Sequence, residues 1–114
     1  MDTIQVTVRL TIHEGKLEEF KALAAECLRS VHERDSGTLQ YDWFFNDSRT
    51  ECVVREMYKD SGAVLEHIAN LGATLGAILG VCDMVLEIYG SPSAELVKAA
   101  AGLAPKVYSP FQSI

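Results

Sequence analysis

The sequence lacks the motifs that usually announce a catalytic chemistry. It has no GxSxG motif, no P-loop, no HExxH motif and no dinucleotide fingerprint. No CxxC motif or Cys/His ligand spacing occurs either. We therefore expect a protein that holds no metal and no cofactor.

Cysteine is scarce and unpaired in this chain. Cys27, Cys52 and Cys82 are odd in number, far apart and surrounded by apolar neighbours. This usage predicts small buried thiols in a reducing compartment, not a disulfide scaffold. The start of the chain, Met1–Ile4, has neither a basic region nor an apolar region, so we expect no signal peptide and a cytoplasmic location.

An excess of positive charge and a long hydrophobic run are also missing. The formal net charge is −6, and lysine and arginine are scattered. A nucleic-acid surface or a basic membrane-binding helix is therefore not expected. The longest apolar run, Leu71 to Cys82, falls short of the roughly 20 residues that span a bilayer.

The length of 114 residues predicts one domain over residues 1–114, with a core over about 4–90 and a C-terminal helix and tail over 91–114. A period of two marks strands, and steps of three and four mark helices. The expected strands cover 4–12, 39–45, 51–58 and 84–89, and the expected helices cover 17–31, 60–71 and 93–101. Residues 72–83 are less regular, and the apolar tail at 107–111 is expected to pack on something, for example a second subunit.

This order, β-α-β-β-α-β plus a terminal helix, predicts an α+β ferredoxin-like fold with four antiparallel strands and helices on one face. The other face of the sheet stays open. Trp43 and Phe44 point to opposite faces of one strand, so at least one large aromatic side chain faces away from the helices. Such a patch predicts a homodimer that forms through the sheets.

Among the three histidines, His67 is the candidate for chemistry. His13 and His32 lie near the ends of elements and are expected at the surface. His67 borders the apolar stripe of its helix, where it is either structural or an acid, base or hydrogen-bond donor. Glycines recur every four residues at Gly72, Gly76 and Gly80, which indicates a thin face against a neighbouring segment or space for a ligand.

Several short motifs resemble the antibiotic-biosynthesis-monooxygenase (ABM-like) branch of the dimeric α+β barrels. The chain has a Gly after the first helix, a Tyr in the second strand, a Glu-x-aromatic end to the third strand and a His in the next helix. These residues are Gly37, Tyr41, Glu56-Met57-Tyr58 and His67, and the break at Gly90-Ser91-Pro92 is also similar.

The chain also departs from that pattern. Many members of the family have Trp where Tyr58 stands, and many have a second His or aromatic residue where Gly72 stands. The haem-degrading branch uses an Asn on the first strand and a later Trp and His. No Asn occurs in residues 1–12, no Trp follows Trp43 and no His follows His67, so haem degradation is not expected.

The resemblance implies a dimeric α+β barrel with a pocket inside each subunit, and a cofactor-independent monooxygenase acting on a small aromatic quinol or phenolic polyketide-like substrate. It implies catalytic roles for His67 and Tyr58 and substrate-binding roles for Tyr41, Trp43 and Glu56. Tyr41 and Trp43 are otherwise plain core or dimer-interface residues. The alternatives are a non-catalytic dimeric barrel that binds a hydrophobic ligand, and an isomerase or decarboxylase with His67 as proton shuttle.

Overall fold

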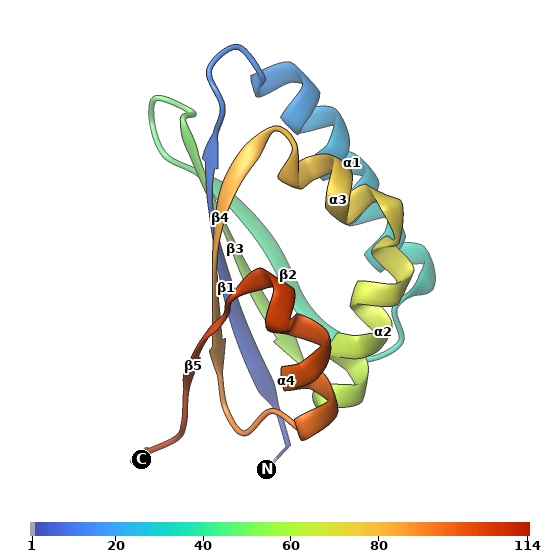
Figure 1. Cartoon of the computed structure of the whole chain (residues 1–114), viewed down its shortest axis with the longest axis vertical. Helices are drawn as coiled ribbons and strands as arrows, with labels where there is room; N and C mark the ends of the chain where they lie inside the picture. Colours follow the sequence, from blue (N-terminus) through green and yellow to red (C-terminus); the bar gives the residue numbers. More distant parts are fainter. Residues whose placement is uncertain (1) are drawn as a thin grey trace.

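The computed structural model describes residues 2–114 and places one sheet against one layer of helices (Figure 1). The strands are β1 (Ile4–Ile12), β2 (Thr38–Phe45), β3 (Glu51–Tyr58), β4 (Cys82–Tyr89) and β5 (Lys106–Tyr108). The helices are α1 (Leu17–Arg34), α2 (Ser61–Leu71), α3 (Ala73–Leu79), α4 (Ala94–Ala100) and the short 3-10 helix η1 (Ala101–Leu103).

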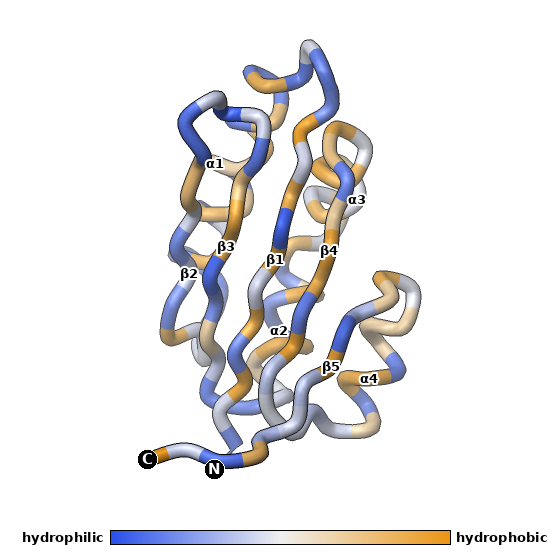
Figure 2. Tube along the Cα trace, turned by 90° about the vertical axis from the view of Figure 1, so that its left-hand side faces the viewer, coloured by the Kyte–Doolittle hydropathy of each residue, from blue (hydrophilic) through white to orange (hydrophobic). Residues whose placement is uncertain are grey.

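The strand order in the sheet is β2-β3-β1-β4-β5, as Figure 2 shows from the side away from the helices. The first four strands pair antiparallel, which confirms the predicted α+β ferredoxin-like fold. Strand β1 lies between β3 and β4. Its alternate residues face the helices: Ile4, Val6 and Leu10 are buried while Gln5 and Arg9 are exposed.

The expectation of only four antiparallel strands is wrong at the C-terminal edge. Residues Lys106–Tyr108 form β5, which runs parallel to β4 and makes the sheet mixed. Tyr108 stacks on Tyr89 with ring centroids 5.1 Å apart. Three residues are too few to show a period of two, so the sequence pattern could not reveal this strand. The apolar tail therefore packs, at least up to Tyr108, on its own chain.

The helices also differ from the prediction at their ends. The stretch after Leu71, expected to be irregular, contains α3, which meets α2 at a bend of 79°. Gly72 joins the two helices with φ +52°, a conformation that favours glycine. Helix α4 begins after Ser93, whose side chain accepts a hydrogen bond from Leu96 N, and ends at Ala100.

Neither explanation for the glycine repeat holds at Gly76. A Cβ atom built there meets nothing within 4 Å, so this glycine is not pressed against a neighbouring segment of the chain. Gly72, Gly76 and Gly80 also do not line the main cavity. The repeat therefore reflects the bend at Gly72 and the end of α3 near Gly80.

The core between sheet and helices consists of two clusters. One gathers around Phe20 of α1 and Cys52 of β3, and the other around Tyr58 of β3 and Leu96 of α4. Val8 and Met84 pack against both clusters. All three cysteines are free and buried, as expected.

The far face of the sheet carries exposed aromatic and aliphatic side chains. The large exposed residues on strands β2, β4 and β5 include Phe44, Val85, Tyr89 and Tyr108. Trp43 instead packs against the core, so the two neighbours do face opposite ways. In residues 2–114 no single helix is long and apolar enough to cross a membrane; α2 and α3 together reach that length and composition, but they are sharply bent.

Candidate functional site

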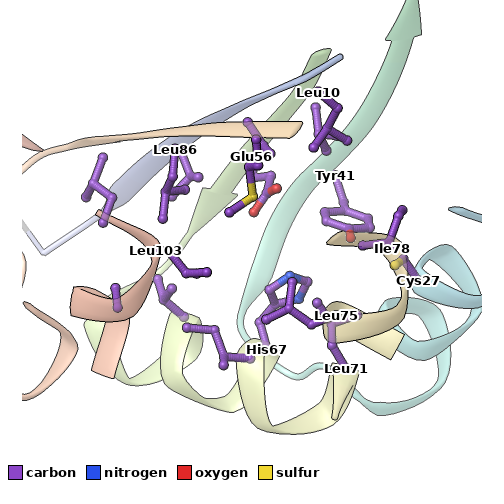
Figure 3. A pocket seen from close by; sticks show the side chains of 18 of the residues that line it. Leu10, Cys27, Tyr41, Glu56, His67, Leu71, Leu75, Ile78, Leu86 and Leu103 are labelled. Carbon is purple, nitrogen blue, oxygen red and sulfur yellow. The ribbon is translucent and has the colours of Figure 1, made fainter. Parts of the chain in front are cut away.

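An apolar cavity of about 90 Å³ lies between the sheet and helices α2, α3 and α4 (Figure 3). Aliphatic side chains from both core clusters form most of its wall. The polar or ionisable groups that line it are Cys27, Tyr41, Trp43, Glu56 and His67. Because water is largely excluded from such a space, each of these groups acts strongly on a bound molecule.

His67 is the polar group that α2 presents to the cavity. The helix begins at Asp60, whose carboxylate accepts a hydrogen bond from Ala63 N at 2.8 Å. His67 Nδ1 lies 2.9 Å from Asp35 Oδ2. An ionised carboxylate can only accept, so Nδ1 carries the proton and Nε2 is a free acceptor. Figure 3 shows the ring pointing from α2 toward the sheet.

Asp35 is a fully enclosed anion at the C-terminal end of α1, with only 1% of its side chain exposed. Its Oδ2 also accepts a hydrogen bond from Thr38 Oγ1 at 2.7 Å, and its Oδ1 accepts one from Asn70 Nδ2 at 2.9 Å. Burial would raise the pKa of Asp35, but these hydrogen bonds and that of His67 outweigh it and lower the pKa. The carboxylate therefore stays ionised and holds the imidazole in one orientation.

The imidazole itself stays neutral at neutral pH. Burial lowers the pKa of His67, and the opposing effect of Asp35 does not fully compensate. The rings of Tyr41 and Tyr58 flank it, with centroids 5.2 Å and 5.3 Å away. A neutral imidazole, oriented by a carboxylate and open to a cavity at Nε2, is the arrangement of a general base.

Gly37 explains how Asp35 reaches α2. A Cβ atom at this position would lie 2.5 Å from the Cβ of Ala63, so only glycine allows the chain to pass so closely. The carbonyl of Gly37 also accepts a hydrogen bond from Lys59 N at 3.0 Å. This close approach packs the segment between α1 and β2 against the first turn of α2, and Asp35 thereby reaches His67.

A second buried acidic group, Glu56, faces the cavity from β3. The hydroxyl of Tyr58 donates a hydrogen bond to Glu56 Oε1. Burial raises the pKa of Glu56 to about 7, although the hydrogen bond from Tyr58 opposes this effect. Burial and the nearby carboxyl also raise the pKa of Tyr58, so its phenol remains protonated. Burial therefore favours the protonated form of Glu56 far more than in a carboxyl group exposed to water.

Tyr41 and Trp43 form an aromatic wall on β2. Their rings meet edge to face at 5.8 Å. Burial raises the pKa of Tyr41, and burial raises that of its neighbour Cys27 to about 11, so both stay protonated at neutral pH. Among residues 2–114, the one buried side-chain nitrogen or oxygen atom without a hydrogen-bond partner is Trp43 Nε1. A ligand oxygen would satisfy this donor.

The structure gathers all five predicted site residues in one region. His67, Tyr41, Trp43 and Glu56 line the cavity, while Tyr58 is completely buried behind Glu56. Their functional roles stay predictions. His13 and His32 are exposed, as expected. In the described part of the chain, no three His, Cys, Asp or Glu side chains come together to hold a metal ion.

Sequence reasoning missed Asp35. The pattern of the Asp35-Ser36-Gly37 segment indicates only the end of the first helix. Nothing in the local pattern distinguishes a helix-ending Asp at the surface from one that turns inward. The available signal was Gly37, because a glycine required by close packing would have drawn the residues beside it toward the next helix.

The fold and the cavity define a ferredoxin-like α+β domain with ionisable side chains in a cavity between its sheet and its helices. The sequence model of the family described as antibiotic biosynthesis monooxygenase matches residues 3–71, which is more than half of the chain. The chain belongs to this family, as the short motifs around Gly37, Glu56 and His67 predict. No curated protein matches the chain by sequence.

Solved structures confirm the fold. MupZ from Pseudomonas fluorescens has a TM-score of 0.84 at 24% identity, covering 100% of this chain and 94% of MupZ. SnoaB, a cofactor-independent oxygenase from Streptomyces nogalater, has a TM-score of 0.69 at 15% identity, covering 82% and 97%. A conserved protein from Methanosarcina mazei has a TM-score of 0.70 at 19% identity, covering 78% and 92%. At these identities the likeness is one of fold alone.

Proposed function

We propose that this protein is a cofactor-independent monooxygenase that oxidises a small, electron-rich aromatic molecule in the cavity. The observation that carries the proposal is the hydrogen bond between Asp35 and His67, which leaves the Nε2 atom of a neutral imidazole facing an apolar space. Family membership supports oxygen chemistry as the use of this base. The structural neighbour SnoaB is a cofactor-independent oxygenase.

The volume of the cavity limits the size of the substrate. Its volume of about 90 Å³ is below the roughly 150 Å³ of an engineered apolar cavity that accepts benzene in another protein. A multi-ring polyketide-like molecule is therefore too large for the cavity, and a single-ring quinol, which is larger than benzene, requires the surrounding side chains to move apart. The edge-to-face pair of Tyr41 and Trp43 supplies an aromatic wall for such a ring.

The reaction requires only the substrate and O2. His67 Nε2 removes a proton from the quinol, and the resulting anion passes one electron to O2. The substrate radical and superoxide then combine into a carbon-bound peroxide, whose O–O bond breaks with loss of water. The net change converts a ring CH2 of the keto tautomer and O2 into C=O and H2O. The protein binds the ring, takes the proton and excludes bulk water.

An oxygen-uptake assay tests the proposal. Purified protein is mixed with single-ring quinols under air, without added metal or flavin, and product formation is followed by mass spectrometry. We expect one O2 consumed per substrate and one oxygen atom retained in the product. Replacing His67 with Ala should slow the reaction about 10²–10⁴-fold. Calorimetry with the same quinols measures whether they bind to the protein.

The outcomes separate the proposal from its alternatives. Quinol binding without oxygen uptake would favour the non-catalytic barrel, which binds a hydrophobic ligand in the same cavity. Conversion of the substrate without oxygen uptake would favour an isomerase or decarboxylase. Uptake that is equally fast in the His67→Ala variant would mean that His67 is not the base.

A further inference from the structure

The cavity holds a second proton-transfer group opposite His67. Glu56 lies on β3 on the sheet side of the cavity, and His67 lies on α2 on its helix side. Figure 3 shows the carboxyl group of Glu56 projecting from the sheet toward the helices and the ring of His67 projecting from α2 toward the sheet. The monooxygenase reaction uses the imidazole but leaves the carboxyl group without a task.

The contacts of Glu56 suit it to be an acid. Tyr58 donates its hydroxyl hydrogen to Glu56 Oε1, which fixes the carboxyl group and leaves Oε2 as the atom to carry a proton. The residue is 8% exposed, and no cation pairs with it among the ion pairs of the described residues. A buried carboxyl group without a cation favours its neutral form.

His67, on the other side of the cavity, is arranged to accept a proton. Asp35 accepts the Nδ1 proton of His67, so Nε2 is ready to receive one. At neutral pH the resting site thus contains a protonated or half-protonated carboxyl group on one side and a neutral imidazole on the other. Two titratable groups in one site, one kept protonated and the other kept unprotonated by its surroundings, are the usual sign of paired acid and base catalysis.

We propose that Glu56 and His67 form an acid–base pair that isomerises small cyclic ketones in this cavity without oxygen. His67 Nε2 takes a proton from the carbon next to the carbonyl group. Glu56 donates its proton to the carbonyl oxygen, so a neutral dienol forms. His67 then returns its proton to the γ carbon, and the hydroxyl proton goes back to Glu56. Substrate and product have the same atoms, and no oxidant or reductant is consumed.

The substrate class follows from the shape and polarity of the cavity. The aliphatic walls suit an alicyclic ring with one oxygen, and the volume of about 90 Å³ limits the substrate to a single ring, for which the side chains must move apart. Trp43 lines the same space, and its Nε1–H has no hydrogen-bond partner among the described residues. This activity shares His67 with the proposed monooxygenase but depends neither on O2 nor on an aromatic substrate.

In the test, the protein is mixed with cyclohex-3-enone in an anaerobic chamber. The ultraviolet absorbance of the conjugated product, cyclohex-2-enone, is followed over time. We expect the reaction to be faster with wild-type protein than in buffer alone. Glu56→Gln and His67→Ala should each slow the catalysed reaction about 10²–10⁴-fold. Glu56→Gln keeps the size of the side chain and an acceptor for Tyr58. Run in D2O, the wild-type reaction should place deuterium at the γ carbon.

The control variant is Glu51→Gln, at the exposed start of the same strand, which should isomerise at the wild-type rate. Circular dichroism checks that every variant is folded. Wild-type protein that is no faster than buffer overturns the proposal, whatever the result of the aerobic quinol assay. A folded Glu56→Gln variant that is as fast as the wild type also overturns it, because the acid would then be another group.

Discussion

Asp35 Oδ2 and His67 Nδ1 lie 2.9 Å apart, although 32 positions separate the two residues in the chain. Asp35 is the C-terminal cap residue of α1, and the imidazole projects from α2. Their hydrogen bond decides which ring nitrogen faces the cavity. The chemistry proposed for this site therefore depends on a contact between two helices as much as on the histidine itself.

Asp35→Asn should slow turnover about 10²–10⁴-fold with quinol or enone. The amide can donate to Nδ1, which would move the ring proton to Nε2 and leave no base at the cavity. Steady-state kinetics on the folded variant measure this effect. The matched control is Asp42→Asn, an exposed residue on β2 whose replacement should change nothing. Unchanged turnover in Asp35→Asn would show that the carboxylate does not set the tautomer.

Glu56 should make the protein less stable as the pH rises. Its pKa is about 7 in the folded protein against 4.5 in a model carboxyl group, so the folded state binds more protons between these values. Its contribution is fully present below about pH 4.5 and is lost as the pH rises through 7. The loss is on the order of 3 kcal/mol, since each pKa unit corresponds to about 1.4 kcal/mol.

The measurement compares wild-type protein with Glu56→Gln by urea unfolding from pH 5 to pH 8. The difference should favour the variant increasingly as the pH rises. The comparison is needed because His67, whose pKa is lowered, acts in the other direction: its contribution is present above pH 6.5 and is lost as the pH falls. A difference between the two proteins that does not vary with pH would contradict the raised pKa of Glu56.

Gly37→Ala should destabilise the protein by about 1–3 kcal/mol, because the new Cβ would lie 2.5 Å from the Cβ of Ala63. The matched control is Gly76→Ala in the middle of α3, where a Cβ meets nothing within 4 Å. That change should stabilise the protein by about 0.5–1 kcal/mol through helix propensity. Thermal unfolding of both variants checks the pair, and equal effects would refute the close packing at Gly37.

Leu103→Ala should extend the range of substrates toward larger rings. Leu103 of η1 lines the cavity and packs against the core cluster around Tyr58 and Leu96. Removing its side chain lengthens the cavity at the end covered by α4 and η1. We expect KM for a two-ring quinol to fall relative to that for a one-ring quinol, with a loss of stability of up to about 2 kcal/mol. Unchanged relative KM values would place the limit on substrate size elsewhere.

The protein should sediment at micromolar concentration near twice the 12.5 kDa mass of one chain. Phe44 is 55% exposed on the sheet face that points away from the helices, so Phe44→Glu should shift the equilibrium toward the monomer. The control is Leu28→Glu, which introduces the same charge at a residue of α1 that is 42% exposed in the helix layer. A wild-type protein that stays monomeric across this range would leave the aromatic face without a partner.

The order of the elements could be predicted because each carries its own periodicity. Strand β3 spans Glu51–Tyr58 as predicted, and α2 begins after Asp60 because an Asp at that place caps a helix. The position of His67 beside the buried face of α2 follows from the same periodicity. These features depend on neighbours within a few residues, which the sequence displays directly.

Other features arise only when distant segments meet. The pairing of β5 with the free edge of β4 depends on an edge that exists only in the folded sheet. The selection of Asp35 as the partner of His67 depends on the packing of α1 against α2. The protonation of Glu56 depends on the removal of water by the layer of helices above the sheet. The sequence by itself determined the elements and the type of side chain at each position. The tertiary structure decided which of these side chains share one dry space, because desolvation and charge pairing act through space and not along the chain.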